Sequence, residues 1–185
     1  MTEFQIYEYT VKPQTKGLWL RRKIGAIILY FVFAAVYFVI SGLLLDGALF
    51  YPMLFALPLI LFGIILFSWK YTKVEFEFQL EGDTLKISEI YGKSARKKKL
   101  EVAVRDFIEI APYTADSQEH VESFAPEKDF LFFSSLDSPA LCYGLFKGAE
   151  DKLWVVYFDV TDEMVRRLRR LNPTNTKELT KIYGG

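Results

Sequence analysis

The sequence predicts a membrane α-helical hairpin joined to a soluble domain of the α+β, mainly-β class, in which short antiparallel strands form a small barrel closed by a C-terminal helix. Three observations lead to this fold class. Residues 24–69 are almost wholly apolar, apolar and polar residues alternate through much of residues 74–160, and an amphipathic helical pattern follows Thr161.

The division of the chain follows from the distribution of charge. Residues 70–185 hold 18 of the 23 basic and 20 of the 23 acidic side chains. We therefore expect an N-terminal cytoplasmic segment (1–23), a two-helix transmembrane hairpin (24–69), a cytoplasmic domain (70–171) and a C-terminal tail (172–185). The balanced net charge gives no general attraction for nucleic acid. The single cysteine, Cys142, cannot form an internal disulfide.

The N-terminal segment allows two interpretations. The stretch "EFQIYEYTV" is rich in aromatic and β-branched residues, which favour an edge strand. The same residues could lie at the membrane surface, and the sequence does not decide between the two.

The apolar run of residues 24–69 is too long for one membrane helix, because a bilayer core about 30 Å thick needs roughly 20 residues. The pair Asp46–Gly47 favours a turn near its middle. We expect one helix from Ile24 to Leu45 and a second from Leu49 to Trp69. Pro52 then lies in the first turn of the second helix, and Pro58 is expected to kink it.

Asp46 is the only fully charged side chain between Ile24 and Trp69. At the centre of a bilayer an aspartate costs roughly 2.5–3.5 kcal/mol, whereas at the tip of a helical hairpin it costs little. The turn interpretation is therefore favoured, and a proton or ion site is the alternative.

Basic residues predict the orientation of the hairpin. Arg21, Arg22 and Lys23 precede the first helix, Lys70 and Lys73 follow the second, and the connecting turn has neither lysine nor arginine. The positive-inside rule places both termini in the cytoplasm and makes the chain a two-pass protein of the cell membrane.

Seven strands are expected after Lys70. Val74, Phe76, Phe78 and Leu80 alternate with polar residues, which is typical of a half-buried strand, and "EGD" at residues 81–83 predicts the turn after it. The remaining strands are expected at residues 84–91, 96–104, 106–113, 129–135, 140–146 and 153–160, with an acidic loop of one or two helical turns at residues 114–127.

The last expected element is a helix that begins after the N-cap Thr161 and ends before Pro173. Met164, Val165, Leu168 and Leu171 form its apolar stripe. The four arginines on its other faces are interpreted as solvated charges that complement the helix dipole.

This order of strands and helix, together with the stretch "GDTLKISEIYGKSARKKKLEV", resembles the pleckstrin-homology-like (PH-like) fold. With the preceding helices, the chain resembles small bacterial two-pass membrane proteins that carry a cytoplasmic PH-like domain. The resemblance covers residues 24–171 and implies a binding module rather than a catalyst. Phosphoinositide-binding members place lysine and arginine around their first hairpin turn, where we expect Glu81, Gly82 and Asp83.

A basic run, Arg96, Lys97, Lys98 and Lys99, lies on the following hairpin. It has two interpretations that the sequence leaves open. These residues could contact anionic lipid, or they could be a solvated strand edge that lysine protects from aggregation.

No catalytic, cofactor or metal motif is found in the sequence. Asp116 and His120 have the i, i+4 spacing of two metal ligands on a helix, but two ligands are too few for a closed site. Cys142 lies in an apolar strand and is expected to be a buried thiol.

The predicted function is that of a membrane-anchored, non-catalytic interaction module at the cytoplasmic face, without a cofactor. Its expected partners are the lipid bilayer and either another protein or a second copy of the chain. The alternatives are anionic-lipid sensing through residues 93–99 and a role as a small accessory subunit of a transport or membrane-enzyme complex.

Overall fold

The computed structural model of the chain describes residues 6–14, 18–44, 47–92 and 95–177. The chain divides into two compact units. We call residues 15–74 and 91–95 the helical unit, and residues 1–14, 75–90 and 96–185 the sheet unit.

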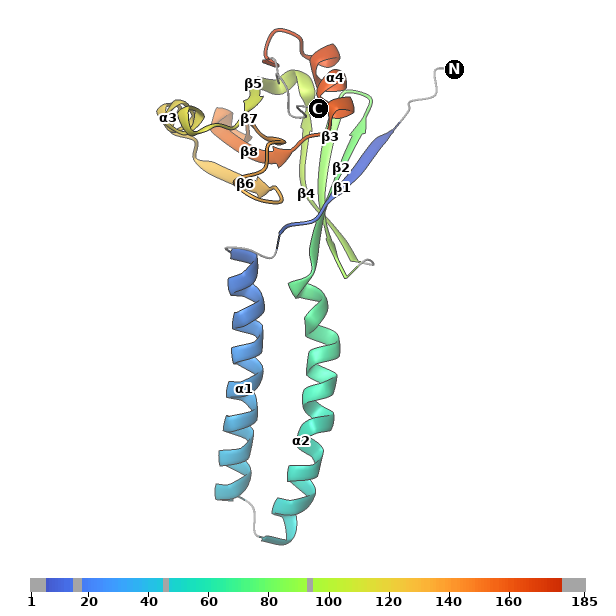
Figure 1. Cartoon of the computed structure of the whole chain (residues 1–185), viewed down its shortest axis with the longest axis vertical. Coiled ribbons are helices and arrows are strands. Elements are labelled where there is room, and N and C mark those ends of the chain that lie inside the picture. Colours follow the sequence, from blue (N-terminus) through green and yellow to red (C-terminus); the bar gives the residue numbers. More distant parts are fainter. Residues whose placement is uncertain (1–5, 15–17, 45–46, 93–94, 178–185) are drawn as a thin grey trace. The chain divides into compact units, whose positions relative to one another are not determined.

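The helical unit contains two long helices, α1 (Leu18–Leu44) and α2 (Gly47–Ser68), followed by a short 3₁₀ helix, η1 (Trp69–Thr72). Figure 1 shows α1 and α2 side by side. By length and composition both are able to cross a membrane, over Leu20–Leu43 and Phe50–Thr72. The predicted pair of apolar helices is confirmed, although α1 begins six residues before the expected Ile24. Asp46 lies outside the described residues.

Two tyrosine hydroxyls connect the helices of this unit. The hydroxyl of Tyr30 lies 2.7 Å from that of Ser68, and the hydroxyl of Tyr37 donates to the carbonyl of Met53 at 2.9 Å. Pro52 and Pro58 lie inside α2, where Pro58 lacks the N–H that would donate to the carbonyl of Leu54.

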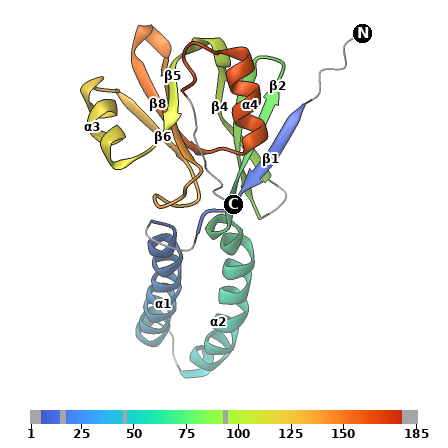
Figure 2. The ribbon, with the colours of Figure 1, turned by 45° about the horizontal axis from the view of Figure 1, so that its top comes forward.

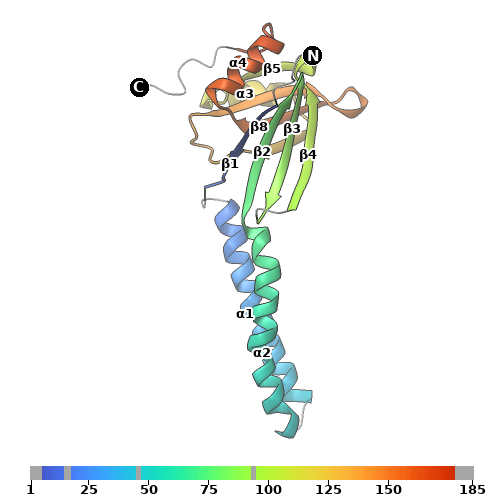
Figure 3. The same cartoon turned by 90° about the vertical axis from the view of Figure 1, so that its right-hand side faces the viewer.

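The first sheet has the strand order β1-β2-β3-β4 (Figure 3). Its strands are β1 (Tyr7–Val11), β2 (Val74–Glu81), β3 (Thr84–Tyr91) and β4 (Ala95–Ala103). β1 and β2 are antiparallel, with Tyr7 opposite Leu80 and Val11 opposite Phe76. The strand before the helices thus pairs with the strand after them. The edge-strand interpretation of the N-terminal segment is confirmed for β1.

The second sheet has the order β5-β7-β8-β6. Its strands are β5 (Phe107–Pro112), β6 (Lys128–Phe132), β7 (Leu141–Lys147) and β8 (Leu153–Asp159), and the 3₁₀ turns η2 (Val104–Asp106) and η3 (Ala149–Asp151) precede β5 and β8. β5, β7 and β8 are antiparallel neighbours, whereas β6 runs parallel to β8. The helix α3 (Ala115–Ser123) lies between β5 and β6 in the chain.

Aromatic side chains join the inner faces of the two sheets. The rings of Phe76 and Phe132 are 5.5 Å apart, and those of Phe78 and Phe158 are 6.1 Å apart. The outer face of the second sheet is also covered, because Val121 of α3 is buried against Tyr143, Leu145 and Val155. Figure 2 shows α3 beside β6 and β8.

The last helix, α4 (Asp162–Leu171), begins at the predicted N-cap, where the Thr161 hydroxyl accepts from the N–H of Met164. Met164 and Leu168 of its apolar stripe are fully buried. The chain then continues along β5. The N–H of Ile110 donates to the carbonyl of Asn175, and the N–H of Lys177 donates to the carbonyl of Ile110.

The predicted closed barrel is wrong. The described strands form two separate four-stranded sheets, and one of their pairs is parallel. The order of helices also differs from a barrel closed by a final helix. The segment containing α3 and β6 is inserted between β5 and β7, and the chain beyond α4 returns to the β5 edge. The physical reason is that the apolar outer face of the second sheet needs a cover, which α3 supplies.

The position of the first β-hairpin also needs correction. Because β1 pairs with β2, the first connection within the sheet holds α1 and α2. The turn at Glu81–Asp83 connects β2 and β3 and is therefore the second hairpin turn.

The β1–β2 register gives a testable prediction. Val11 and Phe76 are directly opposed, so their Cα atoms are about 5 Å apart, a distance that a short turn spans. We expect a variant in which a short glycine–serine turn replaces residues 15–73 to fold as a water-soluble domain. Circular dichroism and a cooperative thermal transition measure this. A matched variant that also lacks residues 1–11 should melt at a clearly lower temperature, and equal melting temperatures would contradict a structural role for β1.

Candidate functional site

The predicted lipid-contact residues Arg96, Lys97, Lys98 and Lys99 lie in the first half of β4, which is an edge strand. All four are consecutive in an extended chain, so they project alternately to the two sides of the sheet. The first three are exposed and Lys99 is half-buried.

Carboxylates of the same sheet neutralise three of these four cations. Arg96 lies 3.0 Å from Glu77 of β2, Lys99 lies 2.9 Å from Glu89 of β3, and Lys98 lies 2.5 Å from Glu101 of β4. The Lys98–Glu101 pair is exposed at both partners, and pairs of this kind contribute little to stability, typically about 0–1 kcal/mol. All three pairs lower the positive charge that β4 presents.

Glu77 is the one buried member of these pairs, since its side chain is only 2% exposed. Burial raises the pKa of the Glu77 carboxyl and a hydrogen bond with Glu8 raises it further, whereas the positive charge of Arg96 lowers it. Arg96 is therefore held by a partner that is itself poorly solvated.

Lys97 differs from its neighbours. It is exposed and forms no ion pair or hydrogen bond with any residue that the structure describes. The structure thus places the four predicted residues together on one edge strand, with one unneutralised cation. The contact of these residues with lipid stays a prediction.

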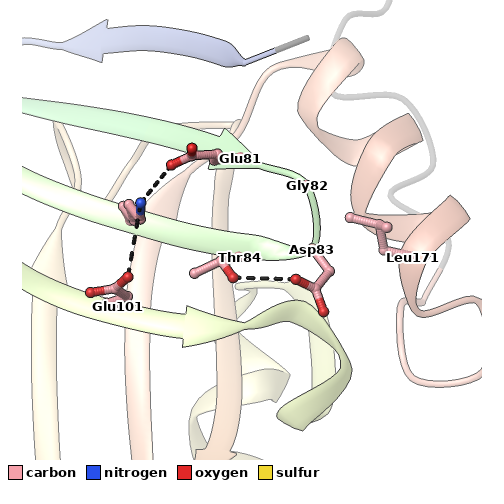
Figure 4. Close-up of a pocket in the computed structure, with 7 residues that line it drawn as sticks. Glu81, Gly82, Asp83, Thr84, Glu101 and Leu171 are labelled. Atoms are coloured by element: carbon pink, nitrogen blue, oxygen red, sulfur yellow. Dashed lines mark hydrogen bonds and ion pairs between the residues drawn. The ribbon is translucent and has the colours of Figure 1, made fainter. Parts of the chain in front are cut away.

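An acidic hollow lies at the opposite end of the first sheet, where β2 turns into β3 (Figure 4). It has a volume of about 690 Å³. Its lining residues are Glu81, Gly82, Asp83, Thr84, Lys86, Glu101 and Leu171. Lys86 bridges Glu81 at 2.5 Å and Glu101 at 3.9 Å, and the Thr84 hydroxyl donates to Asp83. With three carboxylates and one lysine, the hollow repels a phosphate group.

A polar cluster that the sequence did not predict surrounds Glu109 of β5. Its carboxylate lies 3.0 Å from His120 Nε2, accepts from the Tyr143 hydroxyl at 2.8 Å, and forms an ion pair with Lys177. Burial alone would raise the pKa of Glu109. The hydrogen bonds from Lys177, His120 and Tyr143 outweigh burial and lower this pKa to about 2. The cluster fastens α3 and the C-terminal segment to the second sheet.

His120 and Cys142, the two residues that the sequence analysis considered for metal binding or nucleophilic chemistry, make contacts that are typical of structural residues. His120 contacts Glu109 rather than forming a metal site with Asp116, and no group of three metal-ligating side chains occurs among the described residues. Cys142 is fully buried in β7. Burial and, to a lesser extent, the charge of Asp159 raise the pKa of its thiol, which disfavours the thiolate that a nucleophile needs.

The low pKa of Glu109 predicts a pH-dependent contribution to stability. Its pKa is about 2 in the folded protein against an ordinary value of 4.5. The ionised carboxylate therefore stabilises the fold above pH 4.5, and this contribution is lost as the pH falls toward 2. We expect Glu109→Gln to lower the free energy of unfolding most at neutral pH, with a difference from wild type that shrinks between pH 4.5 and 2. Urea denaturation at several pH values measures it. Glu127→Gln, at an exposed surface pair, is the matched control, and a pH-independent effect of Glu109→Gln would contradict the assignment.

Comparison with known proteins agrees with this architecture. The family described as "Bacterial PH-like domain (DUF6106)" matches residues 5–178. The match includes β1, both apolar helices and the segment beyond α4, and it is therefore wider than residues 24–171. No curated protein and no solved structure matches the chain. Because the match covers nearly the whole sequence, the chain belongs to the bacterial PH-like domain family.

Proposed function

We propose that the chain is a membrane-anchored, non-catalytic interaction module at the cytoplasmic face of the cell membrane. The observation that carries the proposal is the insertion of two apolar helices between the paired strands β1 and β2. A binding domain that contains its own membrane hairpin is connected to the bilayer by two chain segments, one at Gln14 and one at Val74. Two connections restrict the domain more than a single flexible linker does.

The surroundings of the reactive side chains support a non-catalytic role. The Cys142 thiol is buried and His120 is engaged with Glu109. The larger polar cluster joins secondary-structure elements to one another, as expected of a structural network.

We propose that the partner at this face is another protein or a second copy of the chain. β1 and β4 are the edges of the first sheet, and edge strands are the usual positions at which an extended segment of a partner is added.

Photocrosslinking in native membranes tests this function. We expect benzoylphenylalanine at Thr10, which is exposed on β1, to give one discrete protein adduct, identified by mass spectrometry as a partner or as a second copy. The same probe at Leu171, beside the acidic hollow, is the control for random collisions. A pattern that is identical at both positions, or adducts with lipid alone, would contradict a protein-binding role for this edge.

The orientation is tested by thiol labelling of intact cells. The Cys142 thiol is buried, so an introduced cysteine is labelled selectively. We expect Asp46→Cys to react with a membrane-impermeant maleimide from outside, and Lys97→Cys to react only after permeabilisation. The reverse pattern would place the sheet unit outside the cell and overturn the cytoplasmic assignment.

A further inference from the structure

The sheet unit has two chemically different ends. At one end the chain passes to and from the apolar helices, since β1 ends at Val11 and β2 begins at Val74. At the other end β2 turns into β3 beside the acidic hollow. A strand rises about 3.3 Å per residue, so the eight residues of β2 separate the two ends by about 25 Å.

Several basic residues of the first sheet lie at the end that leads to the helices, whereas Arg105, exposed beside Asp83, lies at the other end. Arg96 pairs with Glu77, and the residue before Glu77, Phe76, lies opposite Val11 at the end of β1. Lys12 pairs with Glu75 at 3.4 Å. Lys97, which has no partner among the described residues, follows Arg96 directly. The two ends of the first sheet thus differ in charge. Near the chain exits Glu75 and Glu77 pair with Lys12 and Arg96 while Lys97 stays unpaired among the described residues, whereas in the hollow carboxylates outnumber the single lysine.

A second segment reaches the same end. The N–H of Gln14 donates to the carbonyl of Ser134 at 2.9 Å, which fixes the loop of residues 133–139 beside the exit toward α1. The contact between Phe132 and Phe76 places the end of β6 there as well. Gln14 is four residues before Leu18, the first residue of α1. The loop is therefore fixed to the residue from which the chain continues toward α1.

Leu136 lies in this loop, two residues beyond Ser134. Its side chain is 67% exposed, the highest value among the large apolar side chains that the structure describes in the sheet unit. A single exposed leucine is ordinary on a protein surface. This one combines with a basic strand end and a short covalent path to an apolar helix, and those features together match a bilayer interface.

We infer that Leu136 and the Arg96–Lys97 end of β4 form one membrane-contact surface, at which the loop of residues 133–139 enters the interfacial region of an anionic bilayer. The inference rests on the proposed membrane anchoring by α1 and α2 and adds a third point of contact. Asp137, beside Leu136, opposes this contact by its charge. Neutralising it therefore strengthens the contact.

Fluorescence quenching with the full chain in vesicles tests the inference. An environment-sensitive NBD label is attached to Leu136→Cys, to Leu171→Cys at the opposite end, and to Phe62→Cys in α2. The unsubstituted chain shows the background from the buried Cys142. Nitroxide lipids carry the quencher either near the headgroup or deep in the acyl chain. The vesicles contain phosphatidylcholine alone or with phosphatidylglycerol.

We expect the headgroup quencher to act on position 136, the deep quencher to act on position 62, and neither to act on position 171. Quenching at 62 without quenching at 136 overturns the inference and leaves the anchoring intact. Lack of quenching at 62 overturns both. Equal quenching at 136 and 171 also overturns the inference, because it shows that the domain has no preferred membrane-facing end.

The charged part of the surface has its own test. We expect Lys97→Glu to reduce quenching at position 136 in vesicles with phosphatidylglycerol and to have no effect in phosphatidylcholine alone. Asp137→Asn should increase quenching in the anionic vesicles. Added salt should weaken both effects, because exposed charges are screened within about 10 Å at 0.1 M salt. If Lys97→Glu leaves quenching at position 136 unchanged in anionic vesicles, the role of β4 in this surface is overturned.

Discussion

The pairing of β1 with β2 is the interaction on which the rest of the structure depends. It joins residues on either side of the apolar helices through five consecutive residue pairs. The tyrosines of β1 extend this pairing to the second half of the fold. Tyr9 stacks on Phe78 at 4.9 Å and donates to the carbonyl of Asp159, while the Tyr7 hydroxyl lies 2.5 Å from that of Thr161. A five-residue strand is thereby held by its ladder and by side-chain contacts to the residues around the N-terminus of α4.

The second sheet shows why its strands carry apolar residues at nearly every position. In β8, Val156 and Phe158 are buried on the side that faces the first sheet, and Val155 is buried beneath α3. A strand in a sheet that is covered on both faces has apolar residues pointing to both faces. In β2, which belongs to a sheet with one covered face, apolar and polar residues alternate. The Glu109 cluster adds polar contacts that hold α3 in place. The segment from Ala115 to Phe132 is therefore an integral layer of the domain.

Local signals were sufficient to predict much of this structure. The apolar run with its Asp46–Gly47 pair predicted two helices, the alternation from Val74 to Leu80 predicted β2, and the cap at Thr161 predicted α4 at its observed start. Signals of this kind lie within one turn of helix or one strand, where residue spacing determines which side chains share a face.

The features that the sequence analysis missed depend on contacts between distant residues. Glu109, Tyr143 and Lys177 are separated by 34 residues or more, so no spacing rule brings them to one site. The parallel pairing of β6 with β8 was missed for the same reason. Only tertiary packing selects which edge of a sheet a strand joins. The basic run was located correctly on β4, but the carboxylates that neutralise it come from three strands. Burial of Glu77 was likewise not visible in an alternating strand pattern.

The nesting of the helices inside a β-hairpin has a consequence for biosynthesis and for evolution. β1 is translated first, yet its partner strand is completed only at Glu81, after both apolar helices have been translated. The antiparallel ladder requires the two flanking strands to be in the same compartment, so if the insert crosses the bilayer, it does so an even number of times. A change that added or removed a single span would separate β1 from β2 and prevent the first sheet from forming. If the two helices are membrane spans, changes at this position that preserve the first sheet therefore add or remove spans in pairs.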